Sequence, residues 1–151
     1  MICVIQRVTN GSVSVENNII SEIKTGYVIL VGIEKNDVEK DLVWCAEKIV
    51  NMRIFEDNNG KLNLSIKDLS GDILCVSQFT LTANMQKGNR PSFDNAMEPE
   101  NARVLYEKFK LLIEQKYKKP FDGQFQANML VSINNNGPLT IILDSKKRIY
   151  N

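Results

Sequence analysis

The chain has 151 residues, of which 43% are apolar and 25% are charged, and its formal net charge is +1. This length and composition fit a globular protein with its own apolar core, so we expect a single domain over residues 1–151. The near-neutral charge argues against DNA as a partner and against any grip on long nucleic acid, because such domains are strongly basic. It leaves room for contact with a nucleic-acid end.

The first 33 residues have the alternating or β-rich patterns of strands. Turn signals separate them at Asn10-Gly11 and at Thr25-Gly26. We therefore expect a hairpin-rich start with strands at 1–9, 11–17, 18–24 and 27–33.

Two later segments have helical periodicity. In the first, Asn36 or Asp37 is placed to cap a helix, and in the second Pro99 opens one at its first turn. The apolar positions expected to face the core are Val38, Leu42, Cys45, Ala46, Ile49 and Val50 in the first helix, and Ala102, Leu105, Phe109, Leu112 and Ile113 in the second.

The remaining patterns predict a short strand at 52–57, a buried strand at 71–81, a loop at 82–97, and strands at 121–134 and 139–145. The basic tail KKRIYN, residues 146–151, reads as solvated. Together the elements predict an α+β fold dominated by β-structure, with curved sheets or barrel-like closure and two covering helices.

The cysteines Cys3, Cys45 and Cys75 stand in apolar runs at long spacings. Cysteines of this kind are usually buried, which favours free thiols in a reducing compartment over a redox or metal role. The N-terminal stretch lacks the pattern of a secretory leader, and no apolar run is long enough to span a membrane. We expect a cytoplasmic protein that uses no metal or other cofactor and has no membrane partner.

Histidine is absent from the sequence. This excludes Ser-His-Asp and Cys-His catalytic arrangements and any histidine-rich zinc site. If the protein is a hydrolase, its proton transfers come from another group.

Three stretches carry residues suited to chemistry, and each also has a purely structural interpretation. SQFT at 77–80 is either a polar strand end or a pocket in which hydroxyl and main-chain N–H groups meet a carbonyl oxygen. KGNRPSF at 87–93 is either a solvated loop or a loop that contacts phosphate. NNNGPLT at 134–140 is either a hairpin turn or a rigid Gly-Pro segment that presents a carbonyl in an unusual direction.

Taken in order along the whole chain, these stretches resemble the D-aminoacyl-tRNA deacylase family, the D-tyrosyl-tRNA deacylases. The motifs that carry the resemblance are IQRV at 5–8, NMRIFED at 51–57, VSQFTL at 76–81, KGNRPSF at 87–93 and NNGPLT at 135–140. The resemblance implies a homodimer that hydrolyses the ester of D-aminoacyl-tRNA at its 3′ end, and also clears glycine misattached to alanine tRNA. It further implies that the 2′-hydroxyl of the terminal adenosine helps to activate water.

The same resemblance implies roles for particular residues. Thr80, Ser77 and Gln78 are implied as catalytic residues, with Thr80 assisting or positioning. The residues implied in substrate binding are Phe79, which bounds the adenine, Gly137 and Pro138, which form a Gly-cisPro motif entering the partner's pocket, Arg7, which fixes that motif, and Ala96 and Met129, which line the pocket.

Two departures from the family pattern stand out. Gln126 occupies a position where glycine is usual, and Ile2 one where arginine is frequent. The first bears on the local backbone path and the pocket rim, and the second on a phosphate or interface contact. The alternative function is a catalytically inactive module of the same fold that binds an RNA 3′ end. A threonine hydrolase working through an acyl-enzyme is a third reading.

Overall fold

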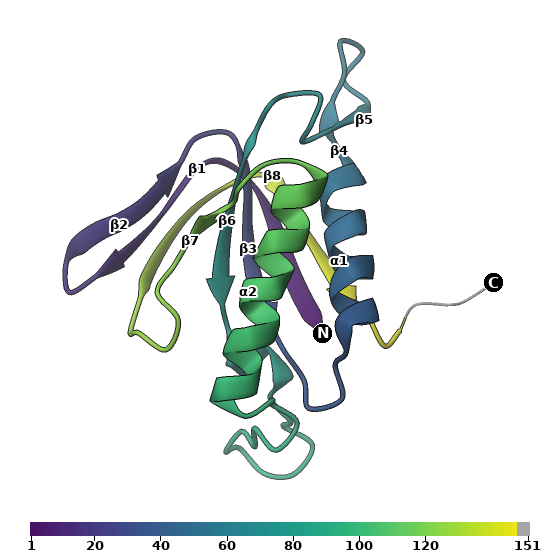
Figure 1. Ribbon diagram of the computed structural model, residues 1–151. Helices are drawn as coiled ribbons and strands as arrows, with labels where there is room; N and C mark the ends of the chain where they lie inside the picture. The colour runs from purple at the N-terminus through teal and green to yellow at the C-terminus, as the bar shows by residue number, and fades with distance from the viewer. Residues whose placement is uncertain (148–151) are drawn as a thin grey trace.

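The structure, a computed structural model, describes residues 1–147 and is built around one strongly curved sheet (Figure 1). The main sheet has the strand order β2-β1-β3-β6-β7, with β8 also paired to β1, and β4 pairs with β5 separately. The elements in chain order are β1 (Ile2–Val15), β2 (Asn18–Ile23), β3 (Gly26–Gly32), α1 (Glu39–Asn51), β4 (Arg53–Glu56), β5 (Leu62–Ser65), β6 (Asp72–Ser77), the 3₁₀ helix η1 (Phe79–Thr82), α2 (Pro99–Lys116), β7 (Phe121–Asp122) and β8 (Leu130–Asp144).

The main sheet curls until its two end strands meet. β2 and β7 stand at opposite ends of the strand order, yet the Ser21 hydroxyl of β2 donates a hydrogen bond to the carbonyl of Asp122 in β7. A twisted sheet covers these two edges in this way, while β8 pairs only with β1 among the described strands and stays an edge strand. The expected β-dominated α+β fold with barrel-like closure and two helices is confirmed, and α1 and α2 lie side by side across the sheet (Figure 1).

The main core lies between these helices and the sheet. Leu42 and Ile49 of α1 and Phe109 and Ile113 of α2 are fully buried there, as their spacing predicts. Each such side chain stabilises the fold by roughly 1.5–3 kcal/mol relative to an exposed one. The three cysteines are free and buried, also as predicted. No helix within residues 1–147 is long and apolar enough to cross a membrane.

The start of α1 differs from the prediction that Asn36 or Asp37 caps it. The N-cap is Val38, which is exposed, and its N–H donates to the Asp41 carboxylate at 2.9 Å. Asp37 is buried instead and forms ion pairs with the N-terminal ammonium of Met1 and, at 3.1 Å, with Lys146. Cations from distant parts of the chain therefore bind the carboxylate that the local pattern predicts as the helix cap.

β1 is one continuous strand, so the predicted turn at Asn10-Gly11 is wrong. Its first half pairs with β3 and its second half with β2, while β8 pairs with both halves. Gly11 lies within the strand, next to a register shift in its pairing with β8, and a Cβ there would come within 2.6 Å of Cγ2 of Val28. The glycine thus allows close packing within a strand rather than a reversal.

The predicted strands at 71–81 and 121–134 are too long. β6 ends at Ser77, and the chain then turns into η1. Only Phe121–Asp122 and the stretch from Leu130 are strand, with a loop between them at 123–129. Gln126 in this loop has a φ of +65°, a left-handed conformation that no regular strand contains.

The segment 134–140 is not a turn between two strands, because β8 runs through it. Gln6 of β1 pairs with Thr140 and Val8 pairs with Asn135, so Arg7 alone faces the four residues 136–139. The β8 chain therefore bulges away from the ladder over residues 136–139, which we call the Gly-Pro bulge. The Gly137-Pro138 bond within it is cis, as the resemblance implies.

Lys146 belongs to the fold, so the reading of residues 146–151 as a solvated tail is wrong at its first residue. Its ammonium contacts the buried Asp37 and Asp41 carboxylates at 3.1 and 2.9 Å. Burial raises the pKa of Asp41, but hydrogen bonds from the Val38 N–H and Lys146 outweigh it and bring the pKa below its ordinary value. Residues 148–151 lie outside the described residues.

We predict that Lys146→Met lowers the free energy of unfolding by about 1–2 kcal/mol, because it leaves buried carboxylates without this cation. The control is Lys147→Met, which removes a side chain that is 85% exposed and forms an ion pair with Asp144 three residues earlier, and which should cost less than about 0.5 kcal/mol. Urea unfolding at neutral pH measures both.

Because the pKa of Asp41 is lowered in the folded protein, the Lys146 contribution is present at neutral pH and is lost as acid protonates the carboxylate. The difference between wild type and Lys146→Met should therefore shrink below about pH 4. Equal losses for the two variants, or a difference unchanged in acid, would contradict this account.

Candidate functional site

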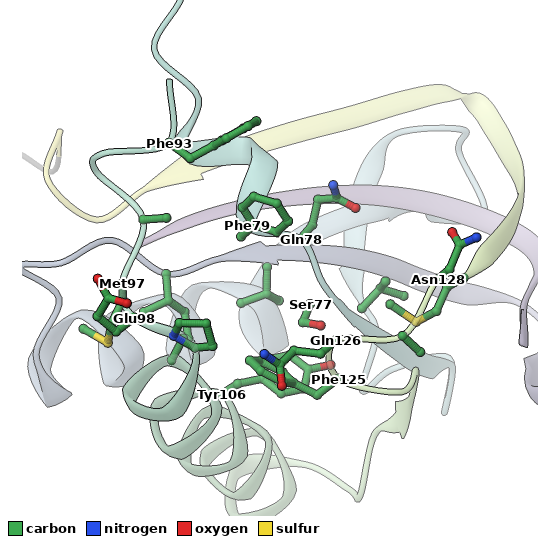
Figure 2. A pocket seen from close by; sticks show the side chains of 18 of the residues that line it. Ser77, Gln78, Phe79, Phe93, Met97, Glu98, Tyr106, Phe125, Gln126 and Asn128 are labelled. Atoms are coloured by element: carbon green, nitrogen blue, oxygen red, sulfur yellow. The ribbon is translucent and has the colours of Figure 1, made fainter. Parts of the chain in front are cut away.

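A cavity of about 720 Å³ opens where β6 ends, within the size range of small-molecule sites. Its walls come from the end of β6, the loop before α2, the first turns of α2 and the loop 123–129. Figure 2 shows Phe79 and Phe93 on one side of the cavity and Tyr106 and Phe125 across from them, with Ser77 between. Segments far apart in sequence thus form one concave surface that includes four aromatic rings.

Five of the predicted site residues line this cavity, namely Ser77, Gln78, Phe79, Ala96 and Met129. β6 places Ser77 at its last position, and the chain then turns, which leaves the Phe79 side chain 58% exposed at the mouth. The Phe79 ring packs edge-on against Phe93, with the ring centroids 5.0 Å apart. The SQFT stretch is therefore a pocket wall and not merely a polar strand end.

Thr80 is exposed and does not line the cavity. Its hydroxyl oxygen accepts a hydrogen bond from the Gln78 side-chain amide, so the two side chains hold each other. Phe79 and Thr80 are the first two residues of η1, and N–H groups at that position have no acceptor within their own helix. These two N–H groups are therefore donors without an acceptor inside η1.

The aromatic floor of the cavity is fixed from behind. The rings of Tyr106 and Phe125 have centroids 5.8 Å apart, and the Tyr106 hydroxyl donates to the Asp122 carboxylate at 2.6 Å. Lys110 pairs with the same carboxylate. Burial, followed by the neighbouring Cys75 and Asp122, raises the pKa of Tyr106, so the phenol stays protonated and serves as a fixed donor.

Three predicted residues, Arg7, Gly137 and Pro138, meet at the Gly-Pro bulge. Arg7 is buried, and it donates through Nε to the Asn136 carbonyl at 3.1 Å and through Nη1 to the Ile54 carbonyl at 2.8 Å. The guanidinium therefore ties the bulge to β4. The predicted contact of Arg7 with main chain is present, at the residue before Gly137.

Glycine is required within the bulge. Gly137 has a φ of +129°, and a Cβ there would lie 3.0 Å from both Nη2 of Arg7 and the Leu139 nitrogen. Asn135 fixes the base of the bulge, because its amide oxygen accepts the Leu139 N–H at 2.8 Å and its amide nitrogen donates to the Thr140 hydroxyl at 2.8 Å. Gly137 and Pro138 are both exposed and neither lines the cavity of its own chain.

Sequence reasoning placed Gln126 at the pocket rim but missed several other lining residues, including Phe93, Glu98, Tyr106, Phe125 and Asn128. Tyr106 lies four residues after Ala102 on the apolar stripe of α2, so helical spacing was a usable signal. The loop residues gave none, because the alternation of Phe125, Ala127 and Met129 is also the pattern of a strand. Gln126 adopts the left-handed conformation that suits glycine and adds an amide to the pocket rim.

Comparison with known proteins points to one family. The family model described as D-Tyr-tRNA(Tyr) deacylase matches residues 4–144. Proteins named D-aminoacyl-tRNA deacylase are similar along nearly their whole length: one from Clostridium novyi is 48% identical over 97% of this chain and 99% of its own, and one from Flavobacterium psychrophilum is 50% identical over 96% and 97%.

Solved structures share the fold. One titled "c-Myc DNA Unwinding Element Binding Protein" has a TM-score of 0.91 and 44% identity over 95% of this chain and 98% of its own. A second, titled "Structural Analysis of a probable eukaryotic D-amino acid tRNA deacylase", has a TM-score of 0.79 and 16% identity, which supports the fold alone, over 94% and 97%. With a family model across residues 4–144 and relatives near half identity, the chain belongs to the D-Tyr-tRNA(Tyr) deacylase family.

Proposed function

We propose that the protein hydrolyses the ester bond of D-aminoacyl-tRNA and releases free D-amino acid and tRNA. The observation that carries this proposal is the Gly-Pro bulge, a piece of main chain held rigidly by Arg7 and Asn135. Membership of the deacylase family supports the reaction class. The aromatic cavity at the end of β6 supplies a place for the 3′ adenosine and its amino acid.

The site is composed of two chains in this proposal. The cavity and the Gly-Pro bulge are separate within one chain, and the bulge is exposed. β8, which carries the bulge, pairs only with β1 in the described part of the protein, and it presents Leu130 and Ile142 at 70% and 67% exposure. An open edge with exposed apolar side chains suits a symmetric contact with a second copy, which would insert each bulge into the other chain's cavity.

Rejection by rigid main chain explains selectivity for the D form. A pocket that accepts many side chains cannot read their chemistry, so it must read the arrangement about the α-carbon. An L-residue held by its amino group and ester would drive its side chain into the Gly137 and Pro138 carbonyls, whereas a D-residue directs its side chain outward. Backbone atoms serve this purpose because they have no rotamer to change. Glycine has no side chain to collide, so glycyl-tRNA is a second substrate in this proposal.

Hydrolysis proceeds without histidine. Water attacks the ester carbonyl carbon, the bond from that carbon to the ribose 3′-oxygen breaks, and a proton passes to the departing oxygen. Main-chain N–H groups at Phe79 and Thr80 hold the developing oxyanion, where one donor contributes about 2.7–4 kcal/mol. The 2′-hydroxyl of the terminal adenosine activates the water, while Ser77 and Gln78 shape the pocket and Thr80 is fixed by Gln78.

The cytoplasm, where aminoacyl-tRNA is made and used, is the proposed location. The alternative, an inactive module that binds an RNA 3′ end, would keep the cavity and lose turnover. The aromatic walls suit either function, because an adenine ring stacks on Phe or Tyr in both. The main-chain donors at η1 favour the enzyme, since binding alone does not need them.

The first prediction from the proposed function concerns handedness. We expect release of tyrosine from D-tyrosyl-tRNA to exceed release from L-tyrosyl-tRNA by at least about 100-fold in kcat/KM, a difference of roughly 2.8 kcal/mol. Thin-layer or radiolabel assays of free amino acid measure both rates. Binding of D-tyrosyl-tRNA without release would favour the inactive module, and equal hydrolysis of both forms would rule out rejection of L-residues by the Gly-Pro bulge.

The second prediction separates RNA-assisted hydrolysis from an acyl-enzyme. Thr80→Ala should keep activity within about tenfold, because the hydroxyl positions rather than attacks. D-tyrosyl-tRNA with a 2′-deoxy terminal adenosine should react more than about 100-fold slower, the usual worth of a positioned proton-transfer group. Single-turnover rates give both values. An inactive Thr80→Ala protein with full turnover of the deoxy substrate would establish the acyl-enzyme reading instead.

A further inference from the structure

Residues 84–92 form an exposed hairpin beside the cavity, which we call the basic hairpin. Asn84 and Ser92 close it by exchanging two main-chain hydrogen bonds of 2.8 and 3.0 Å. Its tip contains Gly88 in a left-handed conformation with φ +69°. In Figure 1 this segment projects past the N-terminal end of α2, away from the sheet and both helices.

The hairpin carries uncompensated positive charge. Lys87 and Arg90 are its only charged residues, and both are exposed. Neither has an ion pair or a hydrogen bond to any residue in the described part of the chain, unlike Lys110 and Lys146. The next carboxylate along the chain, Asp94, accepts a hydrogen bond from the Ser92 hydroxyl at 2.6 Å. On a protein with a net charge of +1, this is a local patch rather than part of a general excess.

The hairpin is joined directly to the cavity wall. Phe93 follows Ser92, lines the cavity and packs against Phe79. Arg90 is three residues before Phe93, a separation that chain geometry limits to about 10 Å. A nucleotide chain whose last base occupies the cavity therefore has its preceding phosphates within reach of these cations.

We propose that the basic hairpin binds the backbone phosphates of the unpaired nucleotides that precede the terminal adenosine of tRNA. The choice of RNA rests on the proposed function, and the hairpin adds the surface that holds the strand. Phosphate contacts of this kind position a strand without reading its sequence, as an enzyme acting on many tRNAs requires. Lys87 and Arg90 contribute to the affinity for the RNA strand, while the cavity determines which ester is hydrolysed.

The test compares two double variants with the same loss of charge. Lys87→Gln with Arg90→Gln removes the hairpin charges. Lys61→Gln with Lys119→Gln removes two exposed lysines at the opposite end of the molecule, one in the β4–β5 turn and one after α2 (Figure 1). The probe is an RNA minihelix that has a single-stranded CCA 3′ end and carries no amino acid. Fluorescence anisotropy gives its Kd across a salt series.

We expect the hairpin variant to bind the minihelix roughly tenfold more weakly near physiological salt. The plot of the logarithm of the association constant against log salt has a negative slope, and its magnitude should decrease by about 1.4, the value for two lost single-strand phosphate contacts. The control pair should stay within about twofold of wild type, and Lys87→Arg with Arg90→Lys should restore binding. With D-tyrosyl-tRNA as substrate, the weaker binding of the hairpin variant should appear as a higher KM. With D-tyrosyl-adenosine, which has no phosphate, the rate should not change.

The outcomes separate the two proposals. If wild type binds the minihelix through these residues but releases no D-amino acid, the proposed function fails and the hairpin assignment stands. Equal binding by the two double variants overturns the hairpin assignment, and so does a wild type that does not bind the minihelix. Slower hydrolysis of D-tyrosyl-adenosine by the hairpin variant also overturns it, because the substitutions would then act through the Phe93 wall.

Discussion

The contact on which the proposed site depends most is the one between the Arg7 guanidinium and the β8 main chain. Arg7 is a buried cation that donates to the carbonyls of Asn136 and Ile54, so it joins the bulge to a strand outside the main sheet. Hydrogen bonds from a charged donor are stronger than neutral ones, and a planar guanidinium fixes direction as well as distance. Without this contact, four unpaired residues of β8 would have only Asn135 to hold them.

The same constraint explains why the bulge contains glycine. The guanidinium approaches so closely that a Cβ at residue 137 would meet Nη2 at 3.0 Å, and the φ of +129° excludes most other residues. Sheet curvature supplies the other half of the arrangement. Because β2 and β7 meet through Ser21, the end of β6 and the loop 123–129 face α2 across a cavity. Rigid main chain and aromatic pocket thus arise from different parts of one fold.

Patterns within a few residues of one another predicted the elements that local physics decides. Pro99 opens α2 and its apolar spacing gives the buried face, because helix start signals and periodicity act locally. The failures occur where a distant group intervenes. The N-terminal ammonium and Lys146 bind the Asp37 carboxylate, so it does not cap the helix, and close packing against Val28 explains why Gly11 lies within a strand rather than in a turn.

The site was predictable to a similar extent. SQFT at the end of an apolar strand was compatible with a polar strand end or with a pocket, and only the family resemblance favoured the pocket. The contact of Arg7 with Asn136 joins residues 129 positions apart and also followed only from family resemblance. The loop 123–129 was not predicted, because apolar and polar residues alternate along it as they do in a strand that faces a core. The positive φ of Gln126 has no local signal, since glutamine is a poor marker for that conformation.

The central claim is that the bulge of one subunit completes the cavity of another. Mixed dimers test it most directly, by pairing a Gly137→Val chain, which has a damaged bulge and an intact cavity, with an Ala96→Phe chain, which has the reverse. Each variant alone should be inactive on D-tyrosyl-tRNA, and an equal mixture refolded together should recover about a quarter of wild-type activity, since half the dimers would contain one intact site. A mixture as inactive as its parents would mean that both parts act within a single chain, and the account would be wrong.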